Sequence, residues 1–412
     1  MRPSFETLPA AAPQDEDAGT PRLPPVRRAR YISGMARVYL DHNATSPLRP
    51  EARTKMLQAL DAGGNASSVH AEGRAARAFV EEARERVAAL VGGKARNVVF
   101  TSGATEGLNL ALSPAWRGPS GAPERLLISA TDHVAAHEGH RFGAAVSSLA
   151  VDRDGRLDLA ALDAALAQEG RPMLCLQAAN NETGVLQPVA DAAARVHAAG
   201  GLVVTDAVQA AGRVPCTFET TGADMLVVSS HKIGGPMGVG ALVVRDPSIV
   251  CDSVMIRGGG QERGIRAGTE NVAAIAGFGA AAGCVTGAPE TPRIAALRDE
   301  FEARLKALAP DVVIYGAAAP RLPNTSAFSI PGTSAETMLM ATDLAGLAVS
   351  SGSACSSGKV KTSHILAAMG ISADVAKGTL RVSFGWNSGA AEVEAALAAL
   401  AGILARKQRK TA

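Results

Sequence analysis

Short apolar runs alternate with longer helical patterns along most of the chain. Alanine-rich stretches with helical spacing cover residues 72–91, 158–169 and 188–199. Between them lie runs of strand length: Val98–Thr101, Leu126–Ser129, Met173–Leu176, Leu202–Thr205, Leu226–Ser229 and, after a Gly-rich turn, Val239–Val244. Short buried strands that alternate with helices of about 10 to 15 residues are typical of a mainly parallel sheet with helices on both faces. The pattern therefore predicts the α/β class.

The regular alternation of strand-like runs and helical patterns ends near residue 291. A helical pattern over 293–308, strand-like runs near 312–315 and 325–330, and an Ala-rich helical pattern at the end of the chain follow. This sequence of elements predicts a smaller α+β domain. We expect a large domain over 51–290, a small domain over 291–412, and a segment over 35–50 that packs with the small domain.

Residues 1–34 differ from the rest of the chain. They are rich in proline, carry the acidic run Asp15-Glu16-Asp17 and a basic run over 27–30, and have no apolar period. No apolar core of a secretory signal is present, and four acidic residues disfavour a transit peptide. We predict a disordered tail, and Met35, just before the strand-like stretch over 37–40, marks an alternative start of the protein.

Charge, hydropathy and cysteine content disfavour several classes of protein. Lys and Arg number 41 against 39 Asp and Glu, a net charge of +2 that disfavours a chain-wide nucleic-acid surface. No apolar run approaches the roughly 18 residues that a membrane span needs. The five cysteines form no CxxC pair, which favours a reducing, cytoplasmic location over disulfides or a zinc site.

Chemistry-bearing residues follow several of the predicted strands, where ligands of open α/β sheets bind. Val98–Thr101 leads into Ser102-Gly103-Ala104-Thr105, a turn suited to phosphate at a helix N-terminus. The turn lacks the GK[ST] of a nucleotide P-loop. Leu126–Ser129 is followed by Asp132 and His133, and Leu202–Thr205 by Asp206 and Gln209. Leu226–Ser229 is followed by Ser230, His231 and Lys232.

Together these groups match one cofactor, pyridoxal 5′-phosphate (PLP). PLP requires a Schiff-base lysine, an acid opposite its ring nitrogen and a phosphate cup. Lys232, Asp206 and the turn over 103–105 fit these three roles. Aromatic residues make up only 3% of the chain, so His133 is the candidate that stacks on the ring.

The sequence resembles the cysteine desulfurases, PLP enzymes of fold-type I in the class V aminotransferase-like group. The matching blocks lie at residues 39–45, 100–106, 180–184, 206–209, 229–232 and 266–269. Ser350–Gly358, with Cys355 at its centre, is similar to the cysteine loop of the NifS/IscS group. The resemblance covers about residues 36–405 and implies a large PLP domain followed by a small domain.

The resemblance also implies roles for individual residues. Lys232 would hold PLP covalently, His133 would lie against its ring, and Cys355 would accept sulfur. Asp206 would face the ring nitrogen and Gln209 the ring hydroxyl. Further cofactor contacts are expected from Ala104, Thr105, Asn181, Ser229, His231 and, from a second subunit, Thr269. The substrate-binding residues would be Asn43, Asn181 and Arg381, since a guanidinium suits a carboxylate.

The implied reaction converts L-cysteine to L-alanine and leaves a persulfide on Cys355. The enzyme would be a homodimer that passes sulfur to an acceptor or Fe–S scaffold protein, for Fe–S assembly or thiolation. Cys355 is also a candidate transient Fe–S ligand, and no resident metal site is expected. Selenocysteine lyase, another class V transaminase and a partner-dependent scaffold remain alternatives.

The sequence departs from the common family pattern at a few positions. Ala66 stands where proline is common, Ser46 where a second threonine is common, and Gln261 where many members have histidine. Asp132-His133-Val134 replaces the usual Glu-His-Pro. None of these changes removes an essential group.

Overall fold

A seven-stranded sheet dominates the computed structural model, which describes residues 37–351 and 363–411. Its strand order is β2 (Val98–Thr101), β9 (Gly240–Val244), β8 (Met225–Ser229), β7 (Leu202–Asp206), β6 (Pro172–Gln177), β4 (Arg125–Ser129) and β5 (Val146–Leu149). The pairs from β8 to β5 are parallel, and only β9 runs against its neighbours. The predicted α/β class is confirmed.

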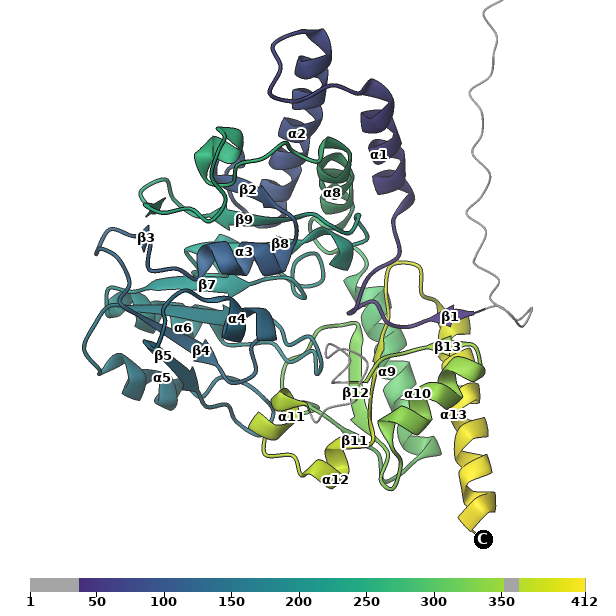
Figure 1. Ribbon diagram of the computed structural model, residues 1–412. Coiled ribbons are helices and arrows are strands. Elements are labelled where there is room, and N and C mark those ends of the chain that lie inside the picture. The colour runs from purple at the N-terminus through teal and green to yellow at the C-terminus, as the bar shows by residue number, and fades with distance from the viewer. Residues whose placement is uncertain (1–36, 352–362, 412) are drawn as a thin grey trace, which may run out of the picture. The chain divides into compact units, whose positions relative to one another are not determined.

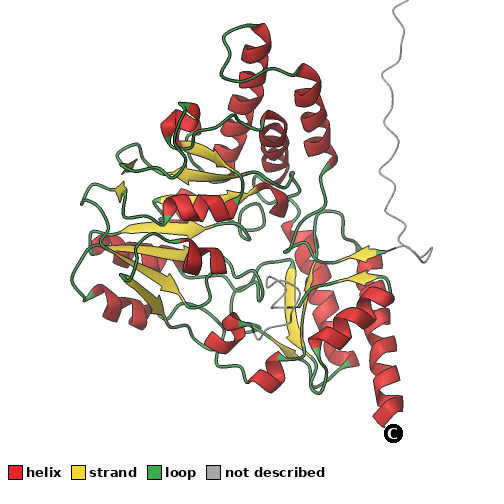
Figure 2. Cartoon of the chain, viewed as in Figure 1, coloured by secondary structure: helices red, strands yellow, loops and turns green. Residues whose placement is uncertain are grey.

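Helices cover both faces of this sheet (Figures 1 and 2). Val203 faces a core formed with α2 (Ala71–Leu90), α5 (Leu159–Leu166), α6 (Val189–Ala198) and α8 (Val272–Val285). Leu202 and Val204 face a second core formed with α3 (Ala104–Ala111) and α4 (Val134–Gly139). Because successive side chains of a strand point to opposite faces, a strand covered on both sides is apolar at consecutive positions, as Leu202, Val203 and Val204 are in β7. α1 (Pro50–Ala62) packs on α8.

The C-terminal part of the chain forms a separate three-stranded antiparallel sheet. Its order is β11 (Val313–Ile314), β12 (Thr325–Ser329) and β14 (Thr379–Ser383). Around it lie α9 (Thr291–Leu308), α10 (Ala335–Leu344), α11 (His364–Ala368), α12 (Ala373–Ala376) and α13 (Ala390–Thr411). A third core joins α9, α10, α13 and these strands.

The segment after residue 37 joins this C-terminal part. β1 (Val38–Tyr39) pairs in parallel with β13 (Leu347–Ala348), and Asp41 bridges to Ser383 on β14. Val38–Ala412 form one compact unit, so the expected boundary at residue 290 stays a prediction. The expected tail over 1–34 lies outside the described residues.

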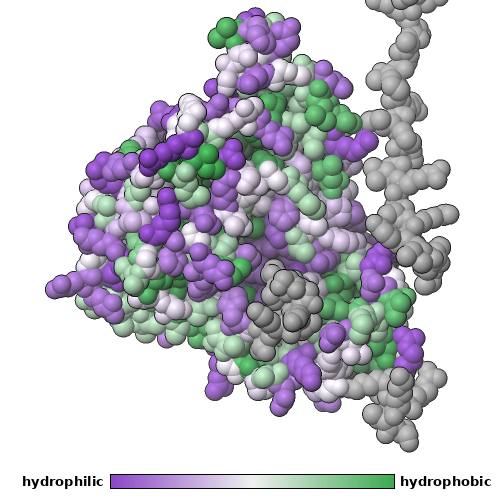
Figure 3. Space-filling view, in the orientation of Figure 1, coloured by the Kyte–Doolittle hydropathy of each residue, from purple (hydrophilic) through white to green (hydrophobic). Residues whose placement is uncertain are grey.

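Short additional elements complete the described fold. β3 (Trp116–Arg117) pairs with β10 (Val250–Cys251), and α7 (Phe218–Thr221) precedes β8. Hydrophilic and hydrophobic residues are interspersed over the face in Figure 3. No described helix combines the length and the apolar character that crossing a membrane requires.

Candidate active site

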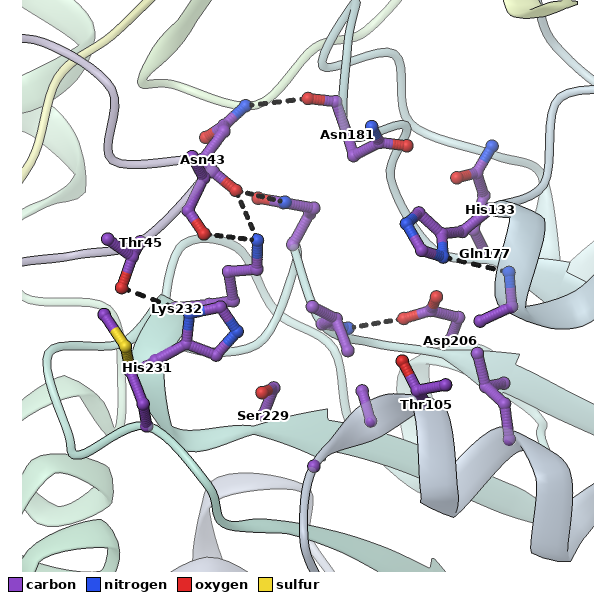
Figure 4. Close-up of a pocket in the computed structure, with 18 of the residues that line it drawn as sticks. Asn43, Thr45, Thr105, His133, Gln177, Asn181, Asp206, Ser229, His231 and Lys232 are labelled. Atoms are coloured by element: carbon purple, nitrogen blue, oxygen red, sulfur yellow. Dashed lines mark hydrogen bonds between the residues drawn. The ribbon is translucent and has the colours of Figure 1, made fainter. Parts of the chain in front are cut away.

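A cavity of about 730 Å³ lies at the carboxyl ends of the central strands. It brings together segments that are far apart in the sequence, from residue 41 to residue 381. The predicted site residues in its lining are Asn43, Ala104, Thr105, His133, Asn181, Asp206, Gln209, Ser229, His231, Lys232 and Arg381. Figure 4 shows many of them around the same space. Cys355 lies outside the described residues.

Asp206 ends β7, and its carboxylate faces the cavity (Figure 4). Its Oδ1 accepts a hydrogen bond from the backbone N–H of Val208 at 2.9 Å. Burial raises the pKa of this carboxyl group, while the nearby His133 and Lys232 oppose the rise. Burial therefore favours the protonated carboxyl group, whereas Lys232 and a protonated His133 would favour the carboxylate.

His133 caps the N-terminus of α4. Its Nδ1 accepts from the backbone N–H of Ala135 at 3.1 Å, so a neutral ring carries its proton on Nε2. Burial lowers the pKa of His133. The site therefore holds a neutral imidazole in a fixed orientation, which suits contact with a flat ring.

Lys232 follows β8 in a single turn of 3-10 helix, Ser230–Lys232. Its Nζ donates to the carbonyl oxygen of Ala44 at 2.8 Å and to that of Asn43 (Figure 4). The ammonium group is therefore held at the cavity wall by the segment that follows β1.

The N-terminus of α3 forms another wall of the cavity. Ala104 and Thr105 open this helix and line the cavity. A Cβ at Gly240 would lie 2.8 Å from the carbonyl carbon of Gly103, so β9 can approach this turn only with glycine there. Free N–H groups at a helix start favour an anion such as phosphate.

His231 lies beside this anion-favouring wall. Its Nδ1 is 3.1 Å from Thr45 Oγ1 (Figure 4). Burial, together with the charges of Lys232 and Arg213, lowers the pKa of His231 to about 4. A neutral His231 near pH 7 retains one ring N–H that can serve as a donor.

Arg381, on β14, enters the cavity from the C-terminal sheet. It donates to the carbonyl oxygen of Asn181 at 2.8 Å and to Asp41 Oδ1 at 2.8 Å. Its Nε and Asn181 Oδ1 are buried and have no partner among the described residues. A bound ligand is what would satisfy such groups, since unpaired buried polar atoms are costly.

The sequence analysis missed two acidic groups at the cavity. Asp41 pairs with Arg381, and Glu106 accepts from Ser102 N–H at 2.8 Å and from Arg266 at 2.9 Å. Both acids lie within family-like blocks of sequence, but their arginine partners are far away in the chain. Only three-dimensional proximity identifies these pairs.

Thr269 does not line the main cavity. It is exposed and lines a smaller pocket of about 120 Å³ together with Phe100 and Gly268. The preceding turn holds Glu262 and Arg263 at positive φ (48° and 57°), where side chains are strained. A buried ion pair between Glu262 and Arg84, 2.7 Å, holds this turn in place.

The residues that depart from the family pattern are built into the fold. Asp132 accepts from the backbone N–H groups of Ser129 and Gln177, at 3.1 and 2.8 Å, and so ties β4 to β6. Ser46 Oγ is 3.0 Å from His42 Nδ1, and Gln261 accepts from Gly268 N–H at 3.1 Å. Ala66 is buried.

The described residues on either side of the segment that contains Cys355 are held by hydrogen bonds, and Ser350 among them lies at the cavity. Ser350 lines the cavity and pairs with Arg381 through the backbone. Ser363 donates to Glu182 Oε2 at 2.6 Å and caps α11 by accepting from Leu366 N–H. Cys355 is five residues from Ser350, within about 18 Å of extended chain.

Glu182 gives a pH prediction. Burial raises its pKa to about 7 from an ordinary 4.5, so the folded protein binds the proton more tightly than the unfolded chain. The resulting stability is complete below pH 4.5 and is lost as pH rises to about 7. Glu182→Gln should therefore gain melting temperature relative to the parent between pH 5 and pH 8, measured without cofactor.

The size of this effect is up to about 3 kcal/mol. Glu169→Gln, at an exposed position, is the matched control and should show no such trend. A constant difference between Glu182→Gln and the parent across this range would contradict the prediction.

The described residues fit PLP. The cavity combines a lysine ammonium, a buried carboxylate, a neutral imidazole and the N-terminus of a helix. These are the groups that a phosphate-bearing pyridine aldehyde requires. The unpaired Arg381 Nε adds a donor that suits the carboxylate of a second ligand, and the unpaired Asn181 Oδ1 adds an acceptor for another group of that ligand.

Comparison with known proteins agrees with this chemistry. The family model described as "Aminotransferase class-V" matches residues 38–396. A cysteine desulfurase of Cereibacter sphaeroides is 41% identical over 90% of this chain and 96% of its own length. The cysteine desulfurase IscS of Anaeromyxobacter is 41% identical over 84% of this chain and 87% of its own.

Solved structures show the same relationship. A NifS-like protein from Rickettsia africae superposes with a TM-score of 0.81 at 34% identity, over 90% of this chain and 99% of its own. The chain belongs to the class-V aminotransferase family of PLP-dependent enzymes. Within this family its activity is that of the cysteine desulfurases, as the NifS/IscS resemblance predicted.

Proposed function

We propose that this enzyme transfers the sulfur of L-cysteine to Cys355, with Lys232 as the group that holds the cofactor and moves the substrate proton. The observation that carries the proposal is the convergence of Lys232, Asp206, His133 and Arg381 on one cavity. Ser350, five residues before Cys355 in the sequence, also lines this cavity. A similar solved structure, 27% identical with a TM-score of 0.72, is titled "SspA in complex with cysteine".

The burial of the four described cysteines supports Cys355 as the sulfur acceptor, because none of those four is suited to that role. Cys175 and Cys216 are buried, and Cys251 and Cys284 are partly buried. Burial raises the thiol pKa of all four, to about 12 for Cys216. Since the thiolate is the nucleophile, none of these four is activated for sulfur transfer.

Each cofactor contact has a group suited to it. Thr105, Ser229, His231 and the N-terminus of α3 at Ala104 would hold the phosphate. Asp206 would keep a proton on the ring nitrogen, Gln209 would donate to the ring oxygen, and His133 and Asn181 would fix the ring. When bound, PLP supplies an electron sink for the bonds at the substrate Cα.

The chain's own residues then handle the substrate. Arg381, Asn43 and Asn181 would bind the carboxylate, a planar group that a guanidinium matches. Lys232 would take the Cα proton as general base and return a proton to the product. These steps need Lys232 Nζ to leave the carbonyl oxygens of Asn43 and Ala44 that it bonds here.

Sulfur transfer balances between the two thiols. The Cys355 thiolate attacks the substrate sulfur, an S–S bond forms, and the Cβ–S bond breaks. The electron pair passes to the substrate Cβ, which takes a proton, so that alanine leaves and Cys355 keeps the sulfur as a persulfide. A soft thiolate is the nucleophile that this step requires.

The activity test uses the purified protein with PLP, L-cysteine and a thiol reductant. Alanine and sulfide should appear in equal amounts without any added protein. Absence of both products from a PLP-loaded preparation would favour the partner-dependent scaffold instead.

We further propose a homodimer with shared active sites, in the cytoplasm, that delivers sulfur to an acceptor or Fe–S scaffold protein. The support is Thr269, which is exposed and outside the cavity of its own chain. Arg266, three residues earlier, is fixed by Glu106 at 2.9 Å, so the segment is held for contact with a partner.

Shared sites predict complementation between two defective variants. In a hybrid of Lys232→Ala and Thr269→Val subunits, one site has both native residues only if Thr269 acts across the interface. Hybrids should therefore recover the PLP affinity that Thr269→Val homodimers lose, about tenfold for one hydrogen bond to a charged group. Hybrids no better than the Thr269→Val homodimer would place Thr269 in its own subunit's site.

A further inference from the structure

Arg213 lies behind the cavity and not in its lining. It follows the turn after β7 and lines a neighbouring space of about 30 Å³. Among the described residues, its guanidinium donates only to oxygens of neutral groups. These are Gln209 Oε1 (2.5 Å) and O (3.2 Å), Asn43 Oδ1 (3.1 Å), and the carbonyl oxygens of His42 (3.3 Å) and Lys232 (3.2 Å).

This arrangement is unlike that of other enclosed arginines in the described chain. Arg84, Arg321 and Arg381 each pair with a carboxylate. Arg213 forms no ion pair with any described residue. Burial and the charge of Arg381 together lower its pKa to about 10, so Arg213 is still cationic at neutral pH. A partly buried cation without a counter-ion favours an anion placed nearby.

Arg213 fixes the orientation of Gln209, which does line the cavity. A guanidinium has donors only, so the Gln209 atom that it contacts must be the amide oxygen. The amide nitrogen therefore lies on the other side, where it donates to the carbonyl oxygen of Asn43 at 3.0 Å. Gln209 can offer a ligand an N–H donor, while its oxygen is already occupied.

We propose that Arg213 is a positioning residue for the cofactor. It locks Gln209 with its donor side toward the cavity, and its charge favours a negatively charged oxygen there. An ionised ring oxygen only accepts hydrogen bonds, so this pair selects the ionised over the neutral ring hydroxyl of PLP. The inference rests on the role proposed above for Gln209.

The same guanidinium also links Gln209 to the lysine. By bonding the carbonyl oxygen of Lys232 and the side chain of Asn43, Arg213 joins three segments that meet at the cavity. Loss of Arg213 should therefore disturb the cofactor site although no atom of Arg213 lines it.

Replacement of Arg213 by methionine tests this role through cofactor binding. Arg213→Met should weaken the affinity of the cofactor-free protein for PLP about tenfold, because Gln209 loses the partner that fixes its donor toward the cavity and the nearby positive charge is removed. The positive charge of Arg213 favours the deprotonated ring oxygen of PLP in the parent. Its removal should therefore move the pH midpoint of the absorbance change of bound PLP to higher pH.

A double-mutant cycle tests whether Arg213 acts through Gln209. In the Gln209→Ala background, Arg213→Met should change PLP affinity much less than in the parent, because the two side chains are coupled. Arg213→Lys keeps the charge and should leave the midpoint at the parent value. It also serves as the folded variant if Arg213→Met does not fold.

If Arg213 only stabilised the fold, its replacement would lower the melting temperature without a specific effect on PLP. Arg321→Met removes another enclosed guanidinium, remote from the cavity lining, and should lower the melting temperature without changing PLP affinity. Parent-like affinity and midpoint in Arg213→Met, additive effects in the cycle, or an equal midpoint shift in Arg213→Lys would overturn the inference. Failure of the parent protein to bind PLP would instead overturn the proposed function.

Discussion

Lys232→Ala should abolish turnover and the covalent link to PLP. Lys232 is the only lysine in the described lining of the cavity, and it is proposed to be both the attachment point and the base at Cα. Removal of a group with both roles costs about 10⁴-fold or more in rate. The variant should still fold, because Gln209 continues to donate to the carbonyl oxygen of Asn43.

Borohydride reduction measures the covalent link independently of activity. In the parent protein, reduction should fix PLP to the peptide that contains Lys232. In Lys232→Ala, PLP should be removed by denaturation after the same treatment. Lys306→Ala, on α9, is the matched control and should behave like the parent. PLP that remains fixed in Lys232→Ala would assign the attachment to another residue.

Cys355→Ser should separate cofactor binding from sulfur transfer. None of the described cavity-lining groups changes, so PLP should bind with parent affinity and L-cysteine should still perturb its spectrum. Alanine formation should fall by about 10⁴-fold or more, since a hydroxyl is much less acidic and less soft than a thiol.

The other cysteines provide the control for this variant. Cys284→Ser alters a partly buried thiol whose pKa is raised by burial, and it should retain parent activity. Alanine formation at the parent rate by Cys355→Ser would favour a lyase or transaminase that does not use this cysteine.

The strands of the large sheet could be predicted because they are short, apolar and buried on both faces. Val98–Thr101 has the same limits in the pattern and in the structure, and the five other predicted strands of this sheet differ by one or two residues in length. β5 was missed because Ser147 and Ser148 interrupt its apolar run at the edge of the sheet. The alternating pattern also does not reveal that β9 runs antiparallel.

Residues at strand ends were the predictable part of the site. Asp206 and Lys232 follow buried strands directly, where polar groups need a reason to be present. The pairing of Arg381 with Asp41 and the contacts of Arg213 join residues far apart in the chain. A single sequence gives no signal for such contacts, because they depend on how the sheets and the segment after β1 pack.

The central claim is that Cys355 receives the sulfur of L-cysteine. The most direct test incubates PLP-loaded protein with L-cysteine in the absence of reductant, followed by alkylation and mass spectrometry of its peptides. The account predicts the added mass of one sulfur atom on the peptide that contains Cys355, in step with the alanine released in a single turnover. Alanine release without that adduct, or with the sulfur on Cys175, Cys216, Cys251 or Cys284 instead, would contradict it.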